Sequence, residues 1–370
     1  MKSLYIGLMS GTSADGVDAV LAEISMPFQF RVLDTFATPY PEHFRKHLLE
    51  LALSEQVSKQ ALGETGFYLA GYFSTAARHL IKQNKLQAAQ ITAIGSHGHT
   101  IDHAPNSQTP YTTQIGNHAR VAELTGITCI ADFRSRDIAA GGQGAPLVPA
   151  FHQWIFQSAP AHSAIVNIGG ISNITVLNQQ NKACAGYDCG PGNCLLDSWH
   201  QQHTDEPFDS EGLSALQGNL LPNLLAKMVA DPYFVKPAPK STGREYFNMT
   251  WLQHYLKKCP ETADWKSISR TLTELTARCI ISEAVRHKCR HLFLCGGGVH
   301  NTLLRERLTS LAEAEGIQTA LTSELGLSGD WVEASAFAWL AHQTVNKLTG
   351  NLPAVTGAIG DRILGAVYPA

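Results

Sequence analysis

The stretch Met9-Ser10-Gly11-Thr12-Ser13-Ala14-Asp15-Gly16-Val17-Asp18 decides the fold of this chain. It lies between two apolar runs, residues 4–9 and 17–24, and a third, largely apolar run follows at 30–37. Runs of this length that are rich in branched and aromatic residues are typical of buried strands. Because the connections are short, they predict an antiparallel meander and not a strand–helix–strand unit. The chain therefore begins with three antiparallel strands whose first turn is rich in glycine.

This first turn has the composition of a phosphate-binding loop. A phosphate needs closely approaching backbone N–H donors, which glycine permits, together with hydroxyl donors. The turn supplies both through Gly11, Thr12, Ser13 and Gly16. A carboxylate from Asp15 or Asp18 could hold Mg²⁺, directly or through water. An ordinary hairpin turn is an equal alternative, since Asp-Gly is a common hairpin dipeptide. No Gly-Lys-Ser/Thr follows, so the turn is not a Walker A loop.

Two further glycine-rich turns follow later in the chain. Apolar runs at 164–168 and 174–177 flank Gly169-Gly170-Ile171-Ser172-Asn173, and the run 292–295 leads into Gly296-Gly297-Gly298 before a helix that starts near Asn301. The first of these repeats the opening pattern, which predicts two similar domains whose turns together grip a triphosphate. The second fails the GxGxxG spacing of dinucleotide folds and suits an adenosine platform better.

Length and composition agree with a two-domain α/β protein. The chain has 370 residues, of which 44% are hydrophobic and 16% charged, and its net charge is −3. No basic stripe is present, so we expect no nucleic-acid partner. No run of about 18 apolar residues is present, so we expect no membrane span and a cytoplasmic protein. Helical patterns are predicted at 41–53, 57–84, 117–125, 191–202, 271–287, 300–315 and 330–348.

Several motifs resemble those of one family, the anhydro-N-acetylmuramic acid kinases of the actin–hexokinase superfamily. Besides the turns at 11–18 and 167–173, they are Ala131-Asp132-Phe133-Arg134, the loop 141–149, Asp188-x-Gly190-Pro191-Gly192-Asn193, the segment 333–341 and the closing stretch 363–369. The sequence departs from the family pattern at His99, where glutamine is expected. The resemblance implies an α/β fold with two actin/hexokinase-like (ribonuclease H-like) lobes, each a mixed sheet flanked by helices, with a cleft between them.

The resemblance also implies the lobes, the reaction and its participants. The N-terminal lobe would span 1–145, with the tail 353–370 packing back on it, and the C-terminal lobe 146–352. ATP and Mg²⁺ would be the cofactors and a small amino sugar the substrate; a homodimer stays open. The expected nucleotide-binding residues are Gly11, Thr12, Ser13, Ala14, Asp15, Gly16, Val17, Asp18, Gly170, Ser172, Asn173, Gly296, Gly297, Gly298 and Asn301, with Asp15 and Asp18 as the Mg²⁺ candidates.

The family's substrate is a 1,6-anhydro sugar, which has no free O6 to phosphorylate. A water activated by a carboxylate must attack C1 while O6 leaves and captures the γ-phosphoryl group. Asp188 is the candidate base, because it ends the strand 183–187 and precedes a predicted helix that has Pro191 near its start. A helix cap is its alternative role. Glu333 is the second catalytic candidate, and a favourable charge in the first turn of its helix is the alternative.

The sugar itself would be bound by His97, Thr100, Arg134, Gln143 and Gly144. The guanidinium of Arg134, with Arg136 close by, could bind the lactyl carboxylate of the sugar bidentately. A surface ion pair with Asp132 or Asp137 is an equal alternative. Gln143 could contact the acetamido group.

Two other functions compete with a kinase. His97, His99 and His103 resemble a metallohydrolase signature and could ligate zinc, although the spacing to Asp102 is off by one residue. A chaperone-like ATPase on the same fold would need an appended partner-binding domain, for which 370 residues leave no room. No GxSxG elbow of a serine hydrolase is present.

Overall fold

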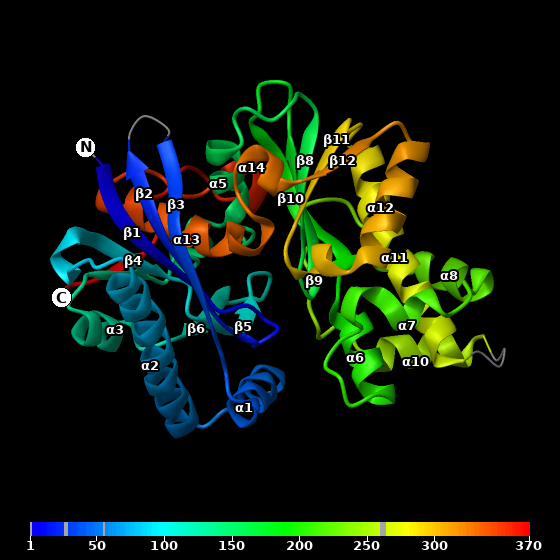
Figure 1. Cartoon of the computed structure of the whole chain (residues 1–370), viewed down its shortest axis with the longest axis horizontal. Coiled ribbons are helices and arrows are strands. Elements are labelled where there is room, and N and C mark those ends of the chain that lie inside the picture. Colours follow the sequence, from blue (N-terminus) through cyan, green and yellow to red (C-terminus); the bar gives the residue numbers. More distant parts are fainter. Residues whose placement is uncertain (1, 26–28, 55, 260–263) are drawn as a thin grey trace. The chain divides into compact units, whose positions relative to one another are not determined.

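The computed structural model describes residues 2–25, 29–54, 56–259 and 264–370. The chain divides into two compact units, drawn with labelled elements in Figure 1. Unit 1 contains residues 1–155 and 331–370, and unit 2 contains residues 156–330.

Unit 1 is built on a six-stranded mixed sheet. Its strands are β1 (Lys2–Met9), β2 (Gly16–Ser25), β3 (Gln29–Pro39), β4 (Ile91–Ser96), β7 (Cys129–Ala131) and β13 (Ala366–Tyr368), in the order β13-β7-β4-β1-β2-β3. The first three strands form the predicted antiparallel meander, whereas β4 is parallel to β1 and β7 is parallel to β4. The tail strand β13 closes the edge by pairing with β7.

Helices cover both faces of this sheet, because successive residues of a strand point to opposite sides. Ile6 and Leu8 of β1 belong to one core cluster with the buried face of α2 (Lys59–Gln83). Gly7 points to the other face, where a Cβ would lie 1.9 Å from the carbonyl oxygen of Ala334 in α13 (Val332–Val345). A Cβ on Gly95 of β4 would likewise lie 2.0 Å from the carbonyl oxygen of Phe337 in α13. Two glycines thus let α13 lie directly on the sheet.

Unit 2 repeats the strand order of unit 1. Its five strands are β8 (Ser163–Ile168), β9 (Ile171–Leu177), β10 (Ala183–Pro191), β11 (His291–Cys295) and β12 (Gln318–Leu321). The sheet order is β10-β9-β8-β11-β12. Strand β9 is antiparallel to both β8 and β10, whereas β11 is parallel to β8 and β12 is parallel to β11. One face packs against α11 (Trp265–Arg286) and α12 (Thr302–Ala314) through a single apolar cluster.

The predicted fold class is confirmed. If the strands of each sheet are numbered in chain order, unit 2 follows 3-2-1-4-5 and unit 1 follows 3-2-1-4-5-6, so both share the order of a ribonuclease H-like sheet and unit 1 adds β13 at the edge. The predicted boundaries differ from the compact units, however. The sequence placed 146–155 and 331–352 in the second lobe, whereas both segments belong to unit 1. The reason is that α13 packs on β1 and β4, and α5 (Val148–Ile155) packs on α13 through aromatic contacts of Trp339.

The remaining elements lie around these sheets. In unit 1 they are α1 (Glu42–Leu53), β5 (His99–Ala104), β6 (Tyr111–Ile115), α3 (His118–Thr125), α4 (Ser135–Ala139) and α14 (Pro353–Thr356); in unit 2 they are α6 (Cys194–His203), α7 (Leu213–Leu216), α8 (Pro222–Val229), α9 (Pro232–Val235) and α10 (Met249–Lys257). Across the described residues, no helix combines the length and apolar character that crossing a membrane requires.

Candidate active site

The first glycine-rich turn connects β1 to β2 and is closed by a hydrogen bond from Ala14 N to Gly11 O at 3.0 Å. Ala14 adopts a left-handed φ of 54°. Gly16 must be glycine for packing, since a Cβ there would lie 2.3 Å from Thr38 O. Gly11 is different, because a Cβ there would meet only Ser13 Oγ, at 3.8 Å, among the described atoms. Packing therefore does not account for Gly11, and its backbone is open to close approach by a ligand.

Ser10, directly before this turn, is held by buried hydrogen bonds. Its buried Oγ accepts a hydrogen bond from Tyr40 Oη at 3.0 Å and lies 3.0 Å from His99 Nδ1. Burial lowers the pKa of His99 to about 4, so the ring is neutral at physiological pH. The histidine that departs from the family pattern therefore supports the glycine-rich turn. Neither Ser10 nor Tyr40 was among the predicted site residues.

The two predicted Mg²⁺ ligands have different surroundings. Asp15 is 68% exposed and forms an ion pair with Arg45 Nε at 3.2 Å. Asp18 lies in β2, close enough to Glu333 at the start of α13 for their charges to interact. Burial and the neighbouring Asp18 raise the pKa of Glu333 to about 6, and Arg134 opposes this rise. Two carboxylates and one guanidinium thus gather within unit 1.

Three of the predicted sugar-binding residues form a hydrogen-bonded group. The Nε and Nη2 atoms of Arg134 lie 3.1 and 2.9 Å from His97 Nε2, and its Nη1 donates to Gly144 O at 2.8 Å. Burial and Arg134 hold the pKa of His97 well below its usual range. The buried carboxylate of Asp137 then fixes the loop, because its Oδ2 accepts from Gly144 N at 2.8 Å.

The same contacts argue against a zinc site at the histidines. A guanidinium, which can only donate, lies on the Nε2 atom of His97 that a metal would need. His99 and His103 are turned to the hydroxyl groups of Ser10 and Thr112. Among the described residues, no group of three or more His, Cys, Asp or Glu side chains could hold a metal ion.

The other two predicted sugar-binding residues are near this group. Thr100 in β5 accepts a hydrogen bond from Gln114 Nε2 at 3.2 Å. Gln143 is held by its backbone, whose N–H donates to Thr356 O at 2.8 Å.

The second glycine-rich turn is hydrogen-bonded to residues 192–194, where α6 begins. Gly170 O accepts hydrogen bonds from Gly192 N and Cys194 N at 2.9 and 3.0 Å, and Gly169 O accepts from Asn193 N at 2.8 Å. Ser172 is fully buried, and its Oγ has no partner among the described residues. Since Ser172 faces the interior, Gly170 and Asn173 are the better candidates for contact with a phosphate at this turn.

Asp188 lies in β10 directly opposite Asn173 of β9. Its Oδ2 accepts a hydrogen bond from Thr242 N at 2.9 Å, and its main-chain N–H donates to Lys240 O at 3.3 Å. The helix-cap alternative is wrong, because β10 continues to Pro191 and α6 begins only at Cys194. The bulge after Asp188 and the φ of 152° at Gly190 extend the strand where a helix start was predicted. Asp188 is therefore not at the N-terminus of α6.

The third turn contains one glycine that packing does not require. Gly296 has a φ of 83°, and a Cβ there would lie 2.2 Å from Asn167 Oδ1; at Gly298 it would lie 2.2 Å from Ile168 Cγ2. A Cβ on Gly297 would meet no described atom of its own unit within 4 Å. Asn301 is the cap of α12, since its Oδ1 accepts from Leu304 N at 3.0 Å. Gly297 is therefore the point where a flat ring could reach the backbone.

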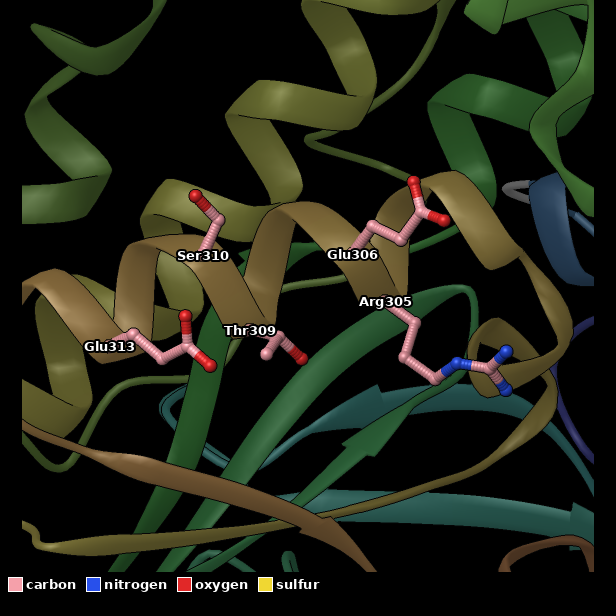
Figure 2. A pocket seen from close by; sticks show the side chains of 5 residues that line it. All are labelled: Arg305, Glu306, Thr309, Ser310 and Glu313. Atoms are coloured by element: carbon pink, nitrogen blue, oxygen red, sulfur yellow. The ribbon is translucent and has the colours of Figure 1, made fainter.

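A hollow of about 330 Å³ lies elsewhere, on one side of α12 (Figure 2). It is lined by Arg305, Glu306, Thr309, Ser310 and Glu313. These residues recur at helical spacing along a single helix, and none comes from a glycine-rich turn. Its lining is therefore an ordinary polar helix face, and we do not assign the reaction to it.

The sequence reasoning missed the segment Lys240-Ser241-Thr242-Gly243-Arg244, which contacts both Asp188 and the second turn. Its signal was available: hydroxyl side chains, a glycine and flanking cations are the composition of an anion-binding loop. It was overlooked because no strand with a clear apolar pattern precedes it.

Comparison with known proteins identifies the family of this chain. A family model described as anhydro-N-acetylmuramic acid kinase matches residues 3–370. Proteins of that name from Nitrosospira multiformis and Pasteurella multocida are 47% and 45% identical to this chain, and the alignments cover 99% of this chain and 99% and 96% of those proteins. A ROK family glucokinase from Streptomyces griseus, solved with glucose and AMPPNP, is 12% identical; 92% of this chain and 100% of that chain are covered at a TM-score of 0.44, which is too distant to indicate a shared function.

Proposed function

The chain belongs to the anhydro-N-acetylmuramic acid kinase family, and from this premise we propose that it opens the 1,6-anhydro ring of its sugar and phosphorylates O6 in one reaction. The products are N-acetylmuramic acid 6-phosphate and ADP. One observation carries the assignment of residues: Asp188 is paired with Asn173, next to the second glycine-rich turn, and is held there by Thr242 N. A fixed carboxylate beside a phosphate turn is what this reaction needs.

In the proposed reaction Asp188 is the general base. Its carboxylate takes a proton from a water whose oxygen forms a bond to C1. The C1–O6 bond breaks with its electron pair on O6. This oxygen then bonds to the γ-phosphorus, and the bond to the β–γ bridging oxygen breaks, which leaves ADP. The acetal carbon carries positive charge as O6 departs, so a moderate base suffices.

The turns at Gly11–Asp18 and Gly169–Asn173 bind the phosphates of ATP, and Gly297 lies against the adenosine. Within these three turns, a Cβ on Gly11, Gly170 or Gly297 would meet no described atom closer than 3.5 Å, so each leaves room for a ligand at its backbone. Arg134, His97 and the Gly144 loop form the sugar side, with Asp137 positioning the loop. Because Arg134 is already bonded to His97 and Gly144, it shapes the loop more than it binds a carboxylate.

Mg²⁺ fits the carboxylates of unit 1. Burial, with a smaller contribution from the charge of Asp18, raises the pKa of Glu333, and carboxylate oxygens are ligands that Mg²⁺ prefers. Kinases, ATPases and polymerases commonly hold Mg²⁺ with one or two carboxylates together with the phosphates of the substrate. Asp18 would hold the ion, with Glu333 orienting its water. The ion would neutralise charge on the phosphates.

Incubation with ATP, Mg²⁺ and the anhydro sugar in oxygen-18 water tests the proposed function. We expect one label at the C1 hydroxyl of the phosphorylated sugar, because water attacks carbon and not phosphorus. The label is located by mass spectrometry of fragments soon after mixing. Unlabelled product placed in the same water corrects for exchange at C1. A label in the phosphate group, or ring opening without ATP, would refute the coupled reaction.

Glu333→Gln is expected to make the protein more stable at pH 7.5 and at least about tenfold slower. The folded pKa of about 6 lies above the ordinary value of 4.5, so the folded state binds the proton more tightly and loses stability as pH rises from 4.5 through 6. Removing the charge relieves this loss above pH 6 and has no effect well below 4.5. Thermal unfolding of the wild type and of Glu333→Gln from pH 4 to 8 measures this difference in stability. Equal stability at all pH values would contradict the raised pKa.

A reducing compartment suits this protein. All eight cysteines are free thiols, and six of them are buried. We therefore place the reaction in the cytoplasm, where such thiols stay reduced.

A further inference from the structure

Arg244 is a cation placed over the second glycine-rich turn. A Cβ built on Gly170 would lie 3.5 Å from Arg244 Nη2 and 3.6 Å from its Nε. The Nε atom is buried and has no hydrogen-bond partner within the described part of the chain. Nor does Arg244 take part in any of the ion pairs found there. A buried donor on a charged group is costly when it is unpaired, so a missing anionic partner is the simplest account of it.

The segment that presents Arg244 is firmly held. Lys240 Nζ forms an ion pair with Glu283 Oε1 at 2.8 Å, and both side chains are only 3% exposed. Two residues later, Thr242 N donates to Asp188 Oδ2. Buried ion pairs of this kind fix geometry even where they add little stability. Arg244 is thus positioned by the same short segment that orients the proposed base.

The second turn lacks positive charge of its own. Residues 167–173 include no Lys or Arg, and the carbonyl oxygens of Gly169 and Gly170 accept N–H groups from residues 192–194. A phosphate at this turn would find little to balance its charge. The positively charged guanidinium of Arg244 lies within reach of a phosphate at Gly170. Its fork of donors matches phosphate oxygens.

We infer that Arg244 binds the γ-phosphoryl group of ATP and stabilises the charge of the transfer step. This inference rests on the proposed binding of ATP phosphates at Gly169–Asn173. The γ-phosphate is chosen over the others because the segment also carries the hydrogen bond to Asp188, which acts at the reacting end of the nucleotide. As the bond from phosphorus to the β–γ oxygen breaks and the bond to O6 forms, the guanidinium donates to the equatorial oxygens. The broken bond leaves its electron pair on ADP.

Arg244→Gln tests this by comparing two nucleotides. Calorimetry measures the dissociation constants of Mg²⁺ with a non-hydrolysable ATP analogue and with ADP, in parallel with steady-state kinetics. The wild type should prefer the analogue, and the variant should lose at least about tenfold of that preference while its ADP affinity stays within about twofold. Its kcat should fall by about 10² or more. Arg244→Lys, which keeps the charge without the fork, should lie between the two. The exposed Arg290→Gln serves as the matched control and should change nothing.

The outcomes separate this inference from the proposed function. Failure of the wild type to bind either nucleotide would contradict the proposed function itself. Equal wild-type affinity for the analogue and ADP, or an unchanged preference in Arg244→Gln, would overturn only the role of Arg244. A raised KM for the sugar with unchanged nucleotide preference would assign Arg244 to the sugar carboxylate and also overturn it. If Arg244→Gln fails to fold, Arg244→Lys decides: a wild-type kcat and preference there would contradict recognition by a guanidinium fork.

Discussion

Asp188→Asn is expected to lower kcat by about 10² or more and to leave the folded structure intact, because the amide cannot take the proton of the attacking water. The asparagine side chain has the same shape as aspartate, and its oxygen can still accept the hydrogen bond from Thr242 N that Asp188 Oδ2 accepts at 2.9 Å. The main-chain bonds of this residue to Lys240 and Tyr233 do not involve the side chain. The substitution therefore removes a base and little else.

The measurement is the rate of ADP release at saturating sugar and ATP, together with the thermal unfolding midpoint. The KM for ATP should stay within about twofold, since Asp188 acts on water and not on the nucleotide. Asp205→Asn, at an exposed position of the same unit, is the matched control and should behave as the wild type. Activity within about threefold of wild type in Asp188→Asn would remove this residue from the mechanism.

Gly297→Val is expected to raise the KM for ATP by at least about tenfold, which corresponds to about 1.4 kcal/mol of lost binding. A Cβ at this position meets no described atom of its own unit, so the branched side chain adds no internal clash and extends into the space proposed for adenosine. The unfolding midpoint should therefore change little, and the KM for the sugar should stay the same.

Position 297 is a sharper test than its neighbour 296. Gly296 has a positive φ of 83° and a Cβ there would lie 2.2 Å from Asn167 Oδ1, so valine at 296 would damage the fold whether or not ATP binds nearby. Gly63→Val in α2 is the control, because a Cβ at Gly63 also meets nothing within 4 Å among the described residues. An unchanged KM for ATP in Gly297→Val would count against the adenosine platform.

Much of the fold could be predicted from local pattern. The predicted strands 4–9, 17–24 and 30–37 lie within β1, β2 and β3, and the apolar run 292–295 lies within β11. The helices predicted at 41–53 and 117–125 differ from α1 and α3 by one residue at their starts. These elements are readable because apolar spacing and glycine placement act over a few neighbouring residues.

Other elements gave no such signal. The edge strands β12 and β13 contain four and three residues, too few for a period to show, and they exist because β11 and β7 supply partners. Helix α13 was predicted as a helix, but its place on the sheet of unit 1 was not. Its sequence does not say which sheet it packs on, and the glycines that admit it, Gly7 and Gly95, are more than two hundred residues earlier.

The sequence by itself determined the three glycine-rich turns, the strands that carry them, the family and the identity of the candidate base. Only the tertiary structure decided which glycines are left open to a ligand, that Asp188 lies mid-strand under the Thr242 N–H instead of capping a helix, and that Arg244 faces Gly170. The physical reason is how far apart in the sequence the interacting residues are. Backbone preference and apolar periodicity are set by near neighbours along the chain, whereas a hydrogen-bond partner or a blocked approach is set by whatever residue the fold brings alongside.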